Sequence, residues 1–325
     1  MAADRSIRAW PWVIAFLAIA LVAVLAAGAW ATWRPLSEHD AARLTARDIV
    51  TSVDESPRDV VPQDTTDRQL SALGPAATPA QRDRLEDTRG TNSGPDATTG
   101  TPDRTPQDAA SADTDLTTAI SRMTELATDQ EDPDLAATMA GIAASWSAEV
   151  TRQDGTAQPL MQNDVSDERA PADAGSQEAE AEVTERCTPE LTAVATQIDR
   201  ALFTAQSADA RGTDFSETAR ALTGWQESLQ RIQDHPAVES LYECEPRPAR
   251  GGYELPRDIA DDPEAASGEV AQDVSAYAQG AISTVTPIER VWLMDILESS
   301  ARAQALLQPS DPVPALAGEH QVSDR

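Results

Sequence analysis

The stretch that decides the fold runs from Asp132 to Val150 and has the sequence DPDLAATMAGIAASWSAEV. Its apolar residues recur at steps of three and four, the spacing of one face of an α-helix. Asp132 and Pro133 suit the N-cap and the first helical position, so the helix begins there. The apolar positions of this face are Leu135, Met139, Ile142, Trp146 and Val150.

The same spacing extends outward in both directions. It predicts a helical hairpin over 113–152 and a helical bundle over 184–308, whose helices open at Thr188, Asp262 and Thr286. Thr286 and Glu289 have the spacing of a capping box. No run alternates apolar and polar residues as a strand does, so the predicted class is all-α, a small helical bundle. One tryptophan falls on each of three predicted helices, where we expect core positions: Trp146, Trp225 and Trp292.

The segments between and after these helices are rich in Asp, Thr, Pro, Gly and Ser. Such segments bury too little apolar surface to offset the entropy of ordering. We therefore expect a disordered acidic linker over 51–112, a second linker over 153–183 and a disordered tail over 309–325.

The N-terminal residues resemble a membrane anchor. No charged residue occurs over 9–33, and the apolar stretch 13–31 spans about 28 Å as a helix, the thickness of a bilayer core. Tryptophan pairs flank it, as is typical of membrane interfaces. These observations predict a transmembrane helix over 10–33, which would bind the lipid bilayer, and a juxtamembrane helix over 34–50 with Ser37 as N-cap.

The expected localisation follows from this anchor. The tail 1–9 is too short to fold and is predicted to be cytoplasmic, with the C-terminal domain extracytoplasmic in a single-pass membrane protein. Arg5 and Arg8 are also compatible with a signal peptide cleaved at Ala27-Gly28-Ala29 or at Ala29-Trp30-Ala31, which would make the protein secreted.

Charge limits the classes of partner. The chain has a formal net charge of −30, which repels nucleic acid, so no nucleic-acid partner is expected. All its strongly basic residues are arginine. With abundant Ala, Asp, Thr and Pro, this composition is typical of a bacterium with a GC-rich genome. Adaptation to high salt is the alternative, since it also gives acid-rich proteins without lysine.

Cysteine occurs only at Cys187 and Cys244. A single pair in an exported domain predicts one disulfide. It would close a loop of about 57 residues and stabilise the domain by about 4 kcal/mol. Two buried free thiols are the alternative.

No motif for nucleophilic, metal or nucleotide chemistry is present, and we expect no catalytic residue, metal or cofactor. Two acidic clusters, 129–134 and 258–264, contain the oxygen ligands that calcium prefers but lack the EF-hand order. Helix capping accounts for them better.

Two sets of residues are candidates for binding. A locally basic loop with one aromatic ring suits an anionic or glycan ligand, or an envelope protein. It comprises Arg247, Arg250, Tyr253 and Arg257. The helix opened at Thr286 has four consecutive apolar residues, more than one neighbour can bury. Either this helix is the central one of the bundle, which we favour, or part of its surface is an apolar patch for a partner. Its candidate partner face comprises Trp292, Leu293, Met294 and Leu297.

The sequence does not establish the activity. It favours a membrane-tethered, non-enzymatic interaction or structural module of the cell envelope. The alternative is an exported helical enzyme or ligand-binding protein whose site no motif reveals.

Overall fold

The computed structural model describes residues 36–56, 61–92, 116–154, 188–210, 216–234, Val238, Leu241 and 253–319. All regular elements in these ranges are helices, which confirms the all-α class. The chain forms two compact units. The smaller comprises residues 1–41 and 76–102, and the larger comprises 42–75 and 103–325.

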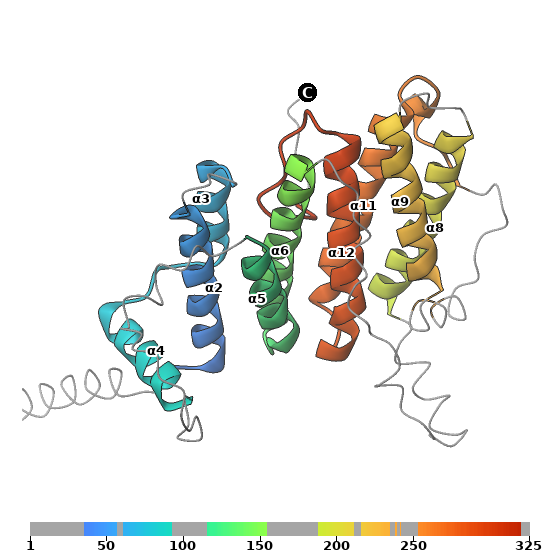
Figure 1. The fold of residues 1–325 in the computed structure, drawn as a ribbon. Helices are drawn as coiled ribbons and strands as arrows, with labels where there is room; N and C mark the ends of the chain where they lie inside the picture. Colours follow the sequence, from blue (N-terminus) through green and yellow to red (C-terminus); the bar gives the residue numbers. More distant parts are fainter. Residues whose placement is uncertain are drawn as a thin grey trace, which may run out of the picture. The chain divides into compact units, whose positions relative to one another are not determined.

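The larger unit contains the main hydrophobic core. Figure 1 shows the helices of the chain with their labels. The hairpin helices α5 (Leu116–Asp129) and α6 (Pro133–Asp154) pack against each other, and α6 also packs on α12 (Pro287–Leu307). Helix α12 in turn packs on α11 (Pro263–Ile282) and α9 (Ser216–Gln233), and α8 (Pro189–Asp209) packs on α9 and α11. A short 3₁₀ helix, η1 (Arg257–Ala260), precedes α11. Helix α12 therefore lies at the centre of the bundle.

Side chains at helix starts explain why these helices begin where the sequence predicts. Asp132 Oδ1 accepts the backbone N–H of Leu135 at 3.0 Å. Thr188 and Asp262 cap α8 and α11 in the same way. Thr286 and Glu289 form the expected capping box at the start of α12. These four predicted helix starts are confirmed.

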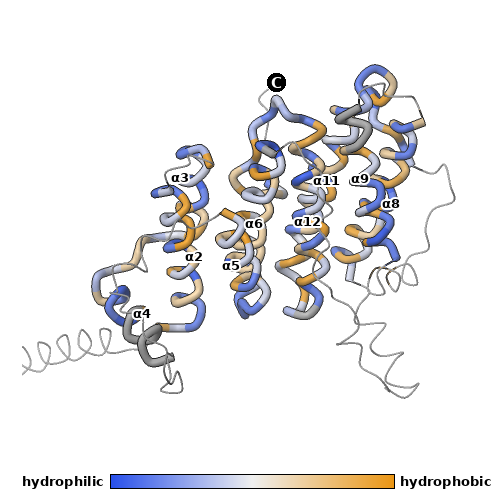
Figure 2. Tube along the Cα trace, in the orientation of Figure 1, coloured by the Kyte–Doolittle hydropathy of each residue, from blue (hydrophilic) through white to orange (hydrophobic). Residues whose placement is uncertain are grey.

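One hydrophobic cluster joins α2, α5, α6, α8, α9, α11 and α12. The three tryptophans predicted for the core are buried in it: Trp146, Trp225 and Trp292. Where the helices are coloured in Figure 2, hydrophobic and hydrophilic positions are interspersed along them, as expected for helices that pack through their apolar side chains.

The prediction of a disordered linker over 51–112 is wrong where the structure forms helices. Helix α3 (Gln63–Ala72) lies in the larger unit, and α4 (Pro79–Asn92) lies in the smaller one. The buried face of α3 is largely polar, which composition cannot recognise as a core: Thr65, Thr66 and Gln69. At the start of α4, the backbone N–H of Thr78 donates to Gln81 Oε1 at 2.9 Å.

Helix α2 (Glu38–Asp54) occupies most of the predicted juxtamembrane helix, and the Asp40 backbone N–H donates to Ser37 Oγ as expected of an N-cap. Its apolar face joins the bundle core. Arg43 and Arg47 of α2 donate to backbone oxygens at the end of α3, including that of Pro75 at 2.6 Å from Arg43. Two cations thus satisfy carbonyls at the negative end of the α3 dipole.

The single-pass membrane localisation requires correction. In the described part of the chain, no helix is long and apolar enough to cross a membrane. These helices are amphipathic and bury their apolar faces against one another. The predicted cytoplasmic tail 1–9 and transmembrane helix 10–33 lie outside the described residues, as do most of the second linker, Cys187 and Cys244. The structure therefore gives no test of the disulfide.

The prediction of a disordered tail over 309–325 is wrong for residues 309–319. Ala315 and Ala317 are buried, and the backbone N–H of Ala317 donates to the Gly141 carbonyl at 3.0 Å. Small buried side chains, the partly buried Val313 and Leu316, and backbone hydrogen bonds hold this segment in place. Two large apolar residues without a helical or strand period did not indicate its order.

Candidate functional site

The predicted ligand loop is only partly described. Arg247 and Arg250 lie outside the described residues. Tyr253 donates its hydroxyl to Asp199 Oδ2 at 2.8 Å, and its ring centroid lies 6.1 Å from that of Phe203. Tyr253 thereby fastens the loop to α8, while Arg257 is exposed at the start of η1. The structure does not bring these two side chains together.

The predicted partner face lies in the core. All four of its residues are buried: Trp292, Leu293, Met294 and Leu297. Because α12 is surrounded by α6, α9 and α11, several neighbours share the burial of its full circumference. This face is not exposed for a partner.

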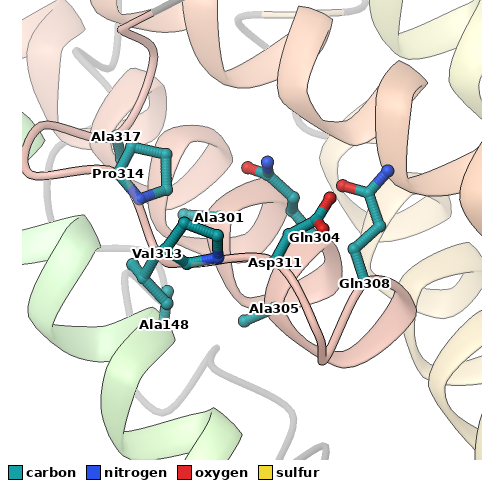
Figure 3. Close-up of a pocket in the computed structure, with 10 residues that line it drawn as sticks. Ala148, Ala301, Gln304, Ala305, Gln308, Asp311, Val313, Pro314 and Ala317 are labelled. Carbon is teal, nitrogen blue, oxygen red and sulfur yellow. The ribbon is translucent and has the colours of Figure 1, made fainter. Parts of the chain in front are cut away.

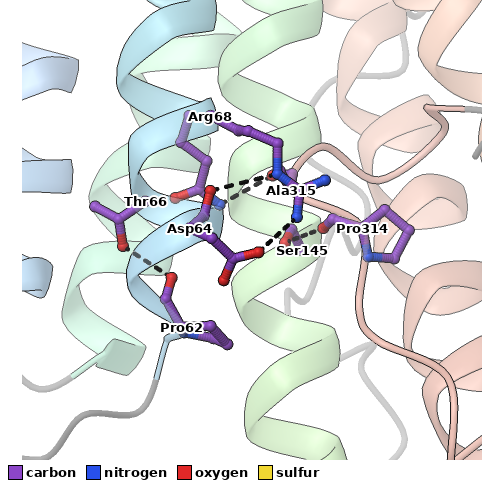
Figure 4. Close-up of polar contacts among 8 residues, drawn as sticks. Pro62, Asp64, Thr66, Arg68, Ser145, Pro314 and Ala315 are labelled. Carbon is purple, nitrogen blue, oxygen red and sulfur yellow. Dashed lines mark hydrogen bonds and ion pairs between the residues drawn. The ribbon is translucent and has the colours of Figure 1, made fainter.

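The most specific polar contacts hold the C-terminal segment, residues 308–319. Gln69 of α3 donates its side-chain amide to the Ala315 carbonyl at 2.9 Å. Ser145 of α6 donates its hydroxyl to the Pro314 carbonyl at 2.6 Å, a contact drawn in Figure 4. Trp146 donates its indole N–H to Gln69 Oε1 at 3.0 Å, which fixes the orientation of the amide. Gln69 and Ser145 are buried, so these bonds form away from water.

Two glycines allow this segment to approach the helices closely. A Cβ on Gly141 would lie 2.6 Å from Gln279 Nε2 and 3.3 Å from the Ala317 carbonyl oxygen. Gly318 has a φ of +88°, and a Cβ there would lie 2.6 Å from Gln279 Oε1. Side chains larger than hydrogen do not fit at either position without movement. We call the surface formed by Gln69, Gly141, Ser145 and Gln279 the tail groove.

A small cavity adjoins the start of this segment. It has a volume of about 10 Å³ and lies between α12, α6 and residues 311–317 (Figure 3). Its polar lining comes from Gln304, Gln308 and Asp311. Such a volume holds roughly one water molecule, so it does not accommodate an organic substrate.

A second polar cluster lies between α12 and α6. Asp295, Glu298 and Arg302 follow one another at steps of three and four on α12, and Ser147 of α6 donates its hydroxyl to Glu298 Oε1 at 2.6 Å. Burial, and secondarily the charge of Glu298, raises the pKa of Asp295 to about 7. Burial also raises the pKa of Glu298, although the Ser147 hydrogen bond and Arg302 oppose this.

Sequence reasoning did not single out either cluster. Two acids three residues apart in the most apolar helix were a usable signal for Asp295 and Glu298. Nothing in the local sequence indicated that Gln69 binds a segment 246 positions away.

The acidic residues do not form a metal site in the described ranges, where no three His, Cys, Asp or Glu residues come together to hold an ion. In the acidic cluster 129–134, Asp132 caps α6. In the cluster 258–264, Asp262 caps α11.

Comparison of the chain with protein-family models, curated proteins and solved structures finds no match.

Proposed function

We propose that this chain is a non-enzymatic interaction module that binds a turn-forming peptide segment in the tail groove. The observation that carries this proposal is the way the groove holds residues 314–317. Three hydrogen bonds join the backbone of this segment to α3 and α6, and its buried side chains are small. The docked segment turns at Leu316–Glu319, where the Glu319 backbone N–H donates to the Leu316 carbonyl at 3.1 Å. A surface of this kind selects a turn of the backbone with small apolar side chains more than any particular functional group.

The hydrogen-bonding needs of the buried polar groups in the groove support the same proposal. If the groove emptied without hydration, the buried Gln69 and Ser145 would each lose a hydrogen-bond partner, at a cost of about 1–3 kcal/mol per group. An occupant that offers carbonyls at the same spacing restores both bonds. The groove therefore favours a replacement peptide over an empty state.

The connection to α12 also suits an exchangeable occupant. Helix α12 ends at Leu307, and residues 309–312, which include Pro309 and Pro312, are exposed. The C-terminal segment can leave the groove through rotations in this connection, with the helix intact.

A fluorescent peptide with the sequence of residues 309–325 tests the proposal. It is titrated against the full-length chain carrying Gly318→Val, which strains the chain's own segment at a positive φ and directs a Cβ at Gln279. We expect saturable binding by fluorescence anisotropy. Adding Gln69→Leu to the same chain should weaken binding about tenfold, the loss expected for one hydrogen bond of about 1.4 kcal/mol.

Two controls complete this experiment. Circular dichroism must show that both variants remain helical, and a peptide with proline in place of Ala317 lacks the N–H that Gly141 accepts. Equal affinity for both peptides, or no binding by a folded Gly318→Val chain, contradicts the proposal.

One observation favours a helical enzyme as the second candidate. A carboxyl with a pKa near 7, such as Asp295, can donate a proton at neutral pH, and perturbed carboxyls cluster at catalytic sites. The small cavity beside residues 311–317, however, is not lined by Asp295 and has room for about one water molecule. A turnover that Asp295→Asn abolishes while folding is preserved would favour the enzyme over the interaction module.

A further inference from the structure

We propose that residues 313–319 are an intramolecular inhibitor of the tail groove, so that another peptide binds there only after this segment has left. This inference rests on the proposed function and names how it is regulated. Three features carry it. The segment engages the polar groups of the groove, it leaves no room for a second peptide, and a short connection holds it close to the groove.

The docked segment uses the hydrogen-bonding groups that another peptide would need. Gln69 and Ser145 donate to the consecutive carbonyls of residues 314–315. The Gly141 carbonyl accepts the backbone N–H of Ala317. A competing peptide cannot form these bonds while the segment holds them, so the two exclude one another.

The groove also has no space for a second peptide beside the segment. Ala315 and Ala317 are buried. A Cβ on Gly318 would lie 2.6 Å from Gln279 Oε1 and 2.9 Å from the Ser275 carbonyl oxygen. The small cavity between α12, α6 and the segment holds roughly one water molecule. Another peptide must therefore displace the segment and cannot bind alongside it.

The connection keeps the inhibitor close to the groove. Helix α12 ends at Leu307, and the Gln308 side-chain amide donates to the Ala265 carbonyl of α11 at 3.2 Å. Only residues 309–312 separate this anchor from the segment. A short flexible tether gives its ligand an effective concentration of about 1 mM. A free peptide at about 1 µM thus competes against a segment about a thousandfold more concentrated, and the intact chain binds it weakly.

The same connection is the place where the inhibition can be removed. Residues 309–312 are exposed and follow the end of α12, whereas the segment after them is partly or fully buried up to residue 318. Once a backbone bond in this connection is hydrolysed, the segment is no longer tethered, and at low protein concentration it dissociates. Cutting the connection should therefore free the groove without changing any residue that lines it.

A single cut in the folded chain tests the inference. The sequence contains no lysine, so Ser310→Lys in the full-length chain gives a lysine-specific endoprotease one site, in the exposed connection. After the cut and gel filtration, the fluorescent peptide 309–325 is titrated against the cut and the uncut chain. We expect the cut to tighten peptide binding at least tenfold by fluorescence anisotropy, because the tethered competitor at about 1 mM is lost.

Ser323→Lys is the matched control. It introduces the same side chain beyond residue 319, the last residue that the structure describes, and a cut there leaves the segment tethered. Peptide binding should not change, and circular dichroism must show the same helix content before and after each cut. A second measurement needs no protease. The unmodified chain should bind the peptide at least tenfold more weakly than the Gly318→Val chain, whose own segment is strained.

The outcomes separate this inference from the proposed function. Equal affinity of the cut and uncut Ser310→Lys chains overturns the inhibition, and so does a gain of the same size after the cut in Ser323→Lys. Equal affinity of the unmodified and Gly318→Val chains overturns it as well. In each of these cases, measurable peptide binding leaves the proposed function standing. If the peptide binds none of the folded chains, the proposed function fails with the inhibition.

Discussion

Ser147 of α6 donates a hydrogen bond of 2.6 Å to Glu298 of α12, on the helix face that also carries Asp295. This contact places two carboxyls of raised pKa in the interface between the two helices. The stability of the bundle should therefore depend on the protonation of these groups.

The sign of this dependence follows from Asp295. Its pKa rises from 3.8 in the unfolded chain to about 7 in the bundle, so the folded chain binds the proton more tightly. Between these two pH values the folded state holds more protons, and the free energy of unfolding falls as pH rises. The loss is complete above about pH 7, where Asp295 is ionised in both states.

Asp295→Asn should remove much of this pH dependence. At pH 8 we expect the variant to be more stable than the unmodified chain by about 1–3 kcal/mol, after allowance for solvent screening, with a smaller difference at about pH 4.5. Urea unfolding across this range measures the effect. Asp67→Asn changes the same charge at an exposed site and serves as the control. Parallel pH profiles for Asp295→Asn and the unmodified chain would refute the prediction.

The substitution Gln69→Leu should destabilise the larger unit by about 2–4 kcal/mol, because it leaves two groups without their hydrogen-bond partner. These groups are the Trp146 indole N–H and the Ala315 carbonyl, and both residues are buried. The free energy of unfolding in urea measures this loss, and Gln63→Leu on the exposed start of the same helix is the matched control. A loss no larger than that of the control would show that the two bonds do not stabilise the unit.

Asp132→Ala tests the helix cap that the sequence predicted. Asp132 Oδ1 accepts the backbone N–H groups of Asp134 and Leu135 at the start of α6. We expect a loss of about 1 kcal/mol in the free energy of unfolding. Asp134→Ala, also near the start of α6 but with an exposed side chain, should cost less, and a larger loss there would contradict the assignment of the cap.

The sequence could predict the features that depend on residues close together in the chain. Caps at Asp132, Thr188 and Asp262 are local, since each side chain bonds an N–H three residues ahead, so the pattern alone locates those helix starts. The apolar period likewise predicted the buried tryptophans. Both depend on nearby residues only.

Contacts between distant residues were beyond such reasoning. Helix α3 buries Thr65, Thr66 and Gln69, a face that hydropathy classes as exposed, and only α6 and the C-terminal segment together make the burial of Gln69 favourable. The C-terminal segment has no amphipathic period that would indicate its order. It is ordered by contacts with Gly141, Ser145 and Gln279, which lie on two helices. Helix α3 and the C-terminal segment each have the composition of a disordered segment when either is considered alone.

The comparison of Gly141→Ala with Gly280→Ala separates helix propensity from close approach. Alanine stabilises a helix interior by up to about 1 kcal/mol relative to glycine. On α11, a Cβ at Gly280 meets nothing within 4 Å, so that variant should gain a few tenths to about 1 kcal/mol. On α6, a Cβ at Gly141 would lie 3.3 Å from the backbone oxygen of Ala317, so the C-terminal segment must shift and strain its bond to the Gly141 carbonyl.

We therefore expect Gly141→Ala to lose about 1 kcal/mol in urea, within the range for overpacking, and to show faster proteolytic cleavage after α12. Gly280→Ala is the matched control, since it makes the same change on a helix surface that nothing covers. Equal stabilisation by both substitutions would mean that the segment yields to a methyl group without cost. The tail groove would then lack the close fit on which its selectivity depends.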